Sequence, residues 1–230
     1  MGKIIIILLL FVSVFASCTK KEDKTTGLVL GIESNPTNLD PRFATDAYSW
    51  TMAGPGGDRI AEKYGLDALK KLTDTMLSKS LVKVTVPLPD GSTRALILPD
   101  FTDPEDSGVK TARGGYHPMG SIEWVGGVIL ALQKNAVRFW DGGDKDTAIY
   151  YKALADALYR EALNAYYKVN GKTVTFYATG QGIEVGHGWK TPFFNAKTSD
   201  GKGIKGGSPV ASFMLLPRLG LNPFMLNDNY

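Results

Sequence analysis

Cysteine and histidine are scarce in this chain, and their scarcity removes several classes of site. The 230 residues include one cysteine and two histidines. A single cysteine cannot build a disulfide framework within the chain or a cysteine-rich zinc site. Two histidines cannot form a multi-histidine metal centre. We therefore expect no metal, and no motif in the sequence calls for a cofactor.

An excess of one charge is also missing. Lys and Arg total 26 and Asp and Glu total 23, so the net charge is only +3. That small excess does not provide the electrostatic footprint that nucleic acid requires, and we expect no nucleic-acid partner. Hydrophobic residues make up 43% and charged residues 21% of the chain. This balance is typical of a folded protein rather than of a disordered one.

Several motifs that mark well-known enzyme chemistries are absent. The chain has no Walker-type phosphate loop, no GxGxxG after a predicted strand, no HExxH and no GxSxG. These absences disfavour nucleotide hydrolysis, dinucleotide binding, zinc proteolysis and the serine esterase chemistry of α/β-hydrolases.

The first 17 residues are typical of an export signal rather than of folded structure. Lys3 supplies a positive charge, and the apolar run from Ile4 to Ala16 is shorter than the roughly 20 residues of a membrane-spanning helix. The run ends at Ser17 and the only cysteine, Cys18. This ending resembles a bacterial lipoprotein signal, which implies cleavage before Cys18, lipidation of Cys18 and a lipid-anchored location in the cell envelope. An ordinary secretory signal is the alternative.

Residues 18–26 are polar and charged, and we expect them to form a flexible tether. From 27 to 110 the sequence predicts an α+β region. Helical spacing predicts a helix over about 59–80, capped by Asp58 and divided at Gly65. Alternating residues around a Pro-Asp-Gly turn predict a β-hairpin over 81–99. We interpret 100–108 as a solvated acidic loop, because it lacks the ligand spacing of a calcium loop.

From 111 to 230 the sequence predicts a mainly helical region, so the fold class is α+β. One apolar helix covers 122–134 and contains Gly126 and Gly127, which favour close packing of another helix. A second helix, capped by Asp144, covers 148–167, and its broad apolar face includes Ile149 and Ala153. We also expect a short β run over 173–177, a glycine-rich loop over 180–188 and a last helix from Ser208.

Two resemblances point to different functions. Residues 28–47, with Glu33, Pro36 and the run Asn38–Pro41, resemble the start of solute-binding lipoproteins that carry peptides or nickel to ABC transporters. That likeness implies solute binding with an ABC permease as partner, and it stops at Tyr48. Residues 114–132, the helix from Asp144, and residues 177–192 and 208–224 resemble hairpins of an (α/α)-toroid carbohydrate-active protein. This second likeness covers more of the chain and implies a partial toroid that binds or hydrolyses a glycan.

The residue types in this half also suit a sugar. Aromatic rings match the apolar faces of a sugar, and polar groups match its hydroxyls. Glycoside cleavage requires two carboxylates with separated pKa values. The candidate catalytic residues are Glu123, Glu184 and Asp141, and the candidate ligand-binding residues are His187, Trp189, Trp124 and His117.

Each of these candidates also has a simpler interpretation. Trp124 can be a core residue, Glu123 can favour the helix dipole, and Asp141 can be a turn residue. His187 and Trp189 are the strongest pair, because they share a glycine-rich loop in which the backbone can approach a ligand. Whether the chain is an enzyme stays open at this point, and a structural lipoprotein without a ligand is the third hypothesis.

Overall fold

A computed structural model describes residues 43–87, 92–169, 171–185, 190–191, 195–197 and 203–205. These residues belong to one compact unit, Arg42–Tyr230. The predicted signal, the tether with Cys18, the solute-binding-like stretch before residue 43 and the last predicted helix lie outside the described residues. The same is true of His187 and Trp189.

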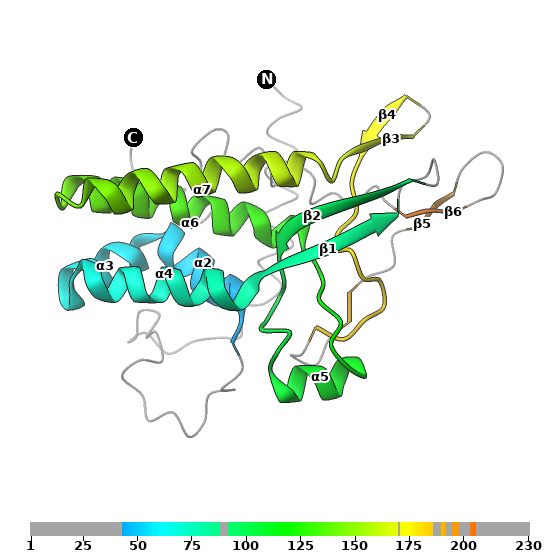
Figure 1. Ribbon diagram of the computed structural model, residues 1–230, viewed down its shortest axis with the longest axis horizontal. Coiled ribbons are helices and arrows are strands. Elements are labelled where there is room, and N and C mark those ends of the chain that lie inside the picture. The colour runs from blue at the N-terminus through cyan, green and yellow to red at the C-terminus, as the bar shows by residue number, and fades with distance from the viewer. Residues whose placement is uncertain are drawn as a thin grey trace, which may run out of the picture. The chain divides into compact units, whose positions relative to one another are not determined.

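The fold is α+β, as the sequence predicts, with helices and two-stranded antiparallel sheets (Figure 1). Its elements are, in chain order, α2 (Thr45–Ala53), α3 (Pro55–Tyr64), α4 (Leu66–Ser80), β1 (Leu81–Pro87), β2 (Thr93–Pro99), α5 (Ser107–Arg113), α6 (Ile122–Asp141), α7 (Lys145–Leu163), β3 (Tyr167–Val169), β4 (Lys172–Val174), β5 (Asn195–Lys197) and β6 (Gly203–Lys205).

The predicted β-hairpin is confirmed. Strands β1 and β2 pair antiparallel from Leu81 opposite Pro99 to Pro87 opposite Thr93. Buried and exposed side chains alternate along β1 as predicted, since its three valines are buried on one face while Lys83 and Thr85 are exposed on the other. The turn residues 88–91 lie outside the described residues.

The predicted division of the first helix at Gly65 is also confirmed. Gly65 has a φ of 84°, a left-handed conformation that favours glycine, and it separates α3 from α4. The prediction that Asp58 caps this helix is wrong. Helix α3 begins at Pro55, because proline fits the first helical turn, where its missing N–H is not needed. The carboxylate of Asp58 instead accepts a hydrogen bond from Arg138 Nε at 2.7 Å.

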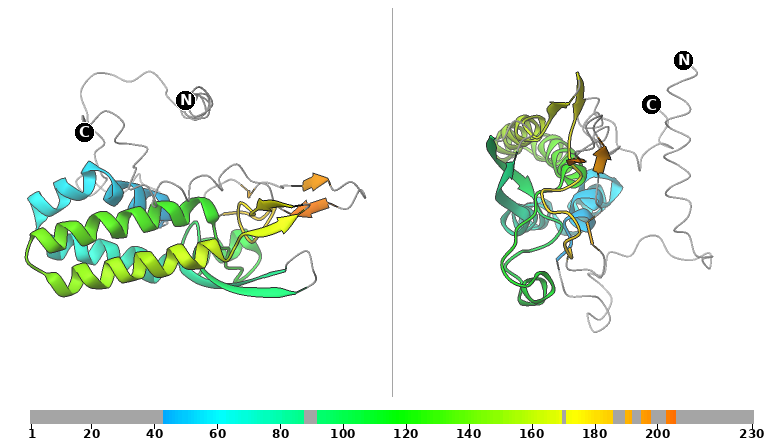
Figure 2. Two further views of the ribbon diagram at one scale, coloured as in Figure 1. Left: turned by 90° about the horizontal axis from the view of Figure 1, so that it is seen from above. Right: turned by 90° about the vertical axis from the view of Figure 1, so that its right-hand side faces the viewer.

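Helix α6 is the central helix of the unit and packs against α2, α4 and α7. Its partner α7 runs antiparallel beside it after a short turn, as both views of Figure 2 agree. Asp144 caps α7 as predicted, by accepting a hydrogen bond from the Thr147 N–H at 3.1 Å. None of the helices in the described ranges is long and apolar enough to cross a membrane.

The face that α7 buries differs from the predicted one. The buried residues form one narrow stripe at helical spacing: Ala148, Tyr151, Ala155, Leu158 and Ala162. Ile149 is 60% exposed and Ala153 is also exposed. The neighbours of α7, chiefly α6 with β2 beside it, cover only this stripe, so the remaining apolar residues of the predicted broad face stay in solvent.

The hydrophobic core includes residues from both sides of residue 110, where the sequence predicts a boundary between two regions. Helices α2 and α4 pack against α6, and the Asn135 side chain of α6 donates to Thr73 Oγ1 of α4 at 2.9 Å. The described parts of both predicted regions therefore share one hydrophobic core.

Candidate functional site

Two helices begin close together and each carries a carboxylate in its first turn. These are Asp46 in α2 and Glu123 in α6. The helices approach closely at Gly127, where an added Cβ would lie 2.9 Å from Ser49 Oγ and 3.1 Å from the Trp50 ring. This confirms the prediction that glycine in the α6 interior admits another helix. Because Ser49 and Gly127 each lie about one turn beyond these carboxylates, the contact brings the two first turns together.

A third segment completes the start of α6. The N–H of Ile122 donates to the Tyr177 carbonyl at 3.0 Å, and the N–H of Thr179 donates to the Gly120 carbonyl at 2.9 Å. Ser121 caps the helix by accepting a hydrogen bond from the Trp124 N–H at 3.1 Å. These bonds hold residues 177–179 against the first turn of α6, where the Tyr177 side chain reaches the Glu123 carboxyl.

The electrostatics of Glu123, Tyr177 and Asp46 are coupled. Burial raises the pKa of Glu123, the hydrogen bond from Tyr177 opposes this rise, and the negative charge of Asp46 adds to it. Burial also raises the pKa of Tyr177, helped by the charge of Glu123. All three residues remain partly exposed. The arrangement is a carboxyl with a raised pKa beside a second carboxylate, within reach of solvent.

Aromatic rings lie beneath this group. The Phe101 ring stacks on Tyr177 with centroids 5.9 Å apart and meets Trp124 edge-on at 4.6 Å. Trp124 is only 8% exposed and belongs to a cluster with Met119 and Val185. Its burial matches the simpler interpretation of a core residue, because a sugar needs an open ring face for stacking.

A buried ion pair that the sequence did not reveal organises the neighbouring loops. Asp100 and Arg113 form a bidentate pair with both side chains fully buried. Asp100 therefore does not belong to a solvated acidic loop, and that part of the prediction is wrong. The same segment also contains the cap of a helix, since Asp106 accepts hydrogen bonds from the N–H groups of Gly108 and Val109 at the start of α5. An Asp followed 13 residues later by an Arg carries no local signal of pairing, because only the tertiary fold brings them together.

Glu184 and His117 are held through their backbones by Arg113. Its guanidinium donates to the carbonyls of Glu184 at 3.0 Å and His117 at 2.9 Å. Ile183 and Val185 pack into the aromatic cluster around Trp124, so alternation along this extended stretch directs the half-buried Glu184 side chain to the opposite side. The His117 side chain is exposed. The structure thus places both residues on loops beside the start of α6.

Asp141 is not brought to this group. It is exposed at the last residue of α6, about 27 Å along the helix axis from Glu123 at 1.5 Å per residue. Two carboxylates that flank one glycosidic bond must lie within about 10 Å. Asp141 and Glu123 therefore cannot act on the same bond.

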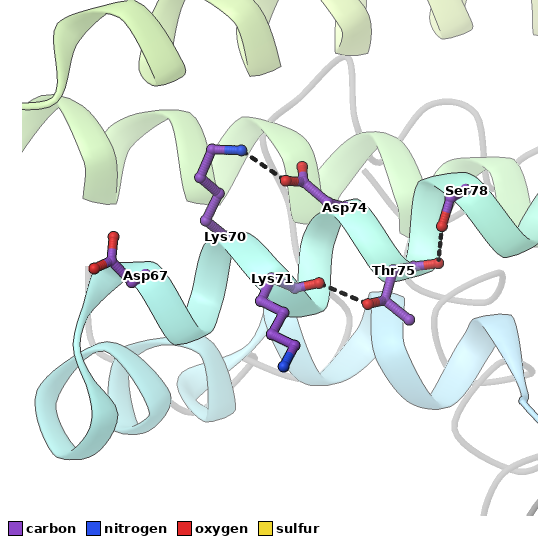
Figure 3. A pocket seen from close by; sticks show the side chains of 6 residues that line it. All are labelled: Asp67, Lys70, Lys71, Asp74, Thr75 and Ser78. Carbon is purple, nitrogen blue, oxygen red and sulfur yellow. Dashed lines mark hydrogen bonds and ion pairs between the residues drawn. The ribbon is translucent and has the colours of Figure 1, made fainter.

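An open hollow of about 440 Å³ lies elsewhere, along α4 (Figure 3). It is lined by polar and charged residues of one helix, which also expose their carbon stems to it: Asp67, Lys70, Lys71, Asp74, Thr75 and Ser78. Lys70 is already paired with Asp74 at 2.6 Å, and none of the predicted site residues within the described ranges lines the hollow. In the described part of the chain, no group of three or more His, Cys, Asp or Glu could hold a metal ion.

No protein-family model, no curated protein and no solved structure matches this chain.

Proposed function

We propose that this chain is a lipid-anchored envelope protein that binds or hydrolyses a glycan at the group formed by Glu123, Tyr177 and Asp46. The observation that carries the proposal is the raised pKa of the partly buried Glu123 beside a second carboxylate. Glycoside chemistry uses two carboxyl groups, one of which has a raised pKa and donates a proton. Asp46 replaces Asp141 in this role, because Asp141 lies at the other end of α6.

The roles follow from the surroundings of each group. Glu123, with its pKa raised by burial, is the proton donor to the glycosidic oxygen. Asp46 is the second carboxylate, which stabilises positive charge on the sugar or activates water. Tyr177 orients the Glu123 carboxyl through its hydrogen bond. The loop that follows Tyr177 leads to Glu184, His187 and Trp189, which supply further contacts to the sugar in this proposal.

The helical part of the proposal is a partial (α/α) toroid. Toroids are built from antiparallel helix pairs. The partial-toroid proposal is supported by α6 and α7, which form one such pair. The membrane part of the proposal depends on the sequence before Cys18, which is typical of a lipoprotein signal. A lipid on Cys18 anchors the protein without spanning the bilayer.

The experiment is a thermal-shift screen of the full chain against a panel of oligosaccharides and a panel of oligopeptides. A ligand that binds only the folded state raises the Tm by mass action. We expect selective shifts with oligosaccharides that are lost in Glu123→Gln and Tyr177→Phe, while the exposed-site control Glu62→Gln keeps them. The loss should not be accompanied by unfolding, because both changes preserve side-chain shape.

Two results would overturn the proposal. Shifts with oligopeptides alone would favour the solute-binding alternative, with an ABC permease as the partner. Oligosaccharide shifts that survive Glu123→Gln and Tyr177→Phe would place the glycan elsewhere. If binding is found, release of reducing sugar by the wild type but not by Glu123→Gln distinguishes hydrolysis from binding.

A further inference from the structure

The outward face of α7 carries an exposed stripe centred on Ala153. This residue lies on the side of the helix opposite the buried stripe that contains Tyr151 and Ala155. Large apolar side chains accompany it, since Ile149 is 60% and Tyr150 57% exposed. No element of the described ranges packs on this face, so its apolar side chains are open to a partner.

The charges of this stripe are symmetric about Ala153. Asp146 precedes Ala153 by seven residues and Arg160 follows it by seven, and both are exposed. Seven residues are about two helical turns, so both charges lie on the same face as Ala153. Neither side chain has an ion-pair partner among the residues that the structure describes.

The pattern is complementary to itself when the helix is reversed. If two copies of α7 cross antiparallel with Ala153 on the two-fold axis, Asp146 of each copy faces Arg160 of the other. Ile149 then faces the small residue Ala157, and the alanines allow the two helices to approach closely. A two-fold interface requires this kind of self-complementary surface.

We infer that the outward face of α7 binds a second copy of this chain in an antiparallel, two-fold dimer. Ile149 and Tyr150 supply the apolar contacts, and the two Asp146–Arg160 pairs determine the direction and register of the helices. Neither Glu123 nor Tyr177 belongs to this face, so dimer formation and glycan binding can be tested separately.

The test is a cysteine crosslink in the full chain. The only native cysteine is Cys18, so Ala153→Cys introduces one new thiol on the proposed axis. Two such thiols meet at a Cα separation of about 4.4–6.8 Å, which a disulfide requires. We expect a disulfide-linked dimer on oxidation, well above the amount formed by the wild type and by Thr111→Cys, a control at an exposed position of α5.

Charge reversal in the Ala153→Cys background tests the register. Asp146→Arg and Arg160→Asp each place like charges opposite one another at both ends, and each should lower the crosslinked fraction by about fivefold. The double variant restores opposite charges and should restore the crosslink, while Glu62→Arg on α3 leaves it unchanged. Crosslinking no greater than that of Thr111→Cys would overturn the inference. A double variant as weak as the single variants would also do so, with unchanged Tm values confirming that all variants fold.

Discussion

Arg113 donates to both carboxylate oxygens of the buried Asp100, at 2.8 and 2.7 Å. Asp100 follows strand β2, and Arg113 is the last residue of α5. The same guanidinium donates to the carbonyls of His117, Glu184 and Val185, while Asp100 accepts from the Met119 N–H at 2.7 Å. One ion pair thereby joins the loop before α6 to the loop that follows Tyr177, and both loops border the candidate site.

Removing one member of this pair should destabilise the fold strongly. We expect Asp100→Ala to lower the free energy of unfolding by about 3–5 kcal/mol, because it leaves a buried guanidinium without its counter-charge. Lys152→Ala, which breaks an exposed pair with Asp156, should change it by less than about 1 kcal/mol. Urea denaturation measures both. An Asp100→Ala protein as stable as the Lys152→Ala protein would show that Arg113 finds other partners.

The close approach of α2 and α6 at Gly127 gives a second prediction. Gly127→Val puts a branched side chain where Ser49 and Trp50 already lie. Overpacking of this kind lowers the free energy of unfolding by about 1–3 kcal/mol, and it should also weaken ligand binding by moving Asp46 away from Glu123. Ala112→Val at an exposed position of α5 is the control for a β-branched residue in a helix. An unchanged Tm in Gly127→Val would contradict the close packing of α2 on α6.

The pKa of Glu123 makes stability depend on pH. Because burial raises the pKa of Glu123 in the folded state, its contribution is fully present below the unfolded pKa of about 4.3. That contribution is lost as the pH rises through the folded pKa. Glu123→Gln stays neutral at every pH. The Tm of this variant should therefore rise relative to that of the wild type as the pH increases, and the difference should become constant above the folded pKa of Glu123. Melting curves between pH 4 and 8, with the exposed Glu62→Gln as control, test this.

Tyr177 should modify that pH profile. Its hydrogen bond lowers the pKa of Glu123 against the effect of burial. Tyr177→Phe should therefore raise the pKa of Glu123 further and move the pH-dependent loss of stability to higher pH. A profile that is the same in Tyr177→Phe and in the wild type would show that the hydroxyl does not act on Glu123.

The proposed lipid anchor gives a prediction that is independent of the described residues. Cys18→Ser removes the only thiol in the chain, so no lipid can be attached there. The variant should leave the membrane fraction or retain its signal, and fractionation with an N-terminal mass measurement distinguishes these results. A Cys18→Ser protein with a cleaved signal that still sediments with membranes would rule out anchoring through Cys18.

Features that depend on neighbouring residues in the chain were predictable from the sequence, whereas features that depend on distant residues were not. The hairpin over 81–99, the division at Gly65 and the Asp144 cap were all predictable, because turn residues, φ preferences and capping hydrogen bonds involve neighbours in the sequence. Glu123 was also a candidate from sequence, as an acid at the start of an apolar helix. The predicted cap at Asp58 is wrong because α3 begins three residues earlier, at Pro55, and proline is a good first helical residue.

The tertiary structure alone decided which of these groups meet. Glu123 interacts with Tyr177, 54 positions later, and with Asp46, 77 positions earlier. Asp141 lies at the far end of the same helix, because each residue adds about 1.5 Å along the helix axis. The burial of Asp100 and Arg113 was decided in the same way. The sequence by itself determined local conformation and the supply of carboxylates and aromatics. Packing determined their partners and pKa values, because burial and charge proximity arise only when distant segments share one core.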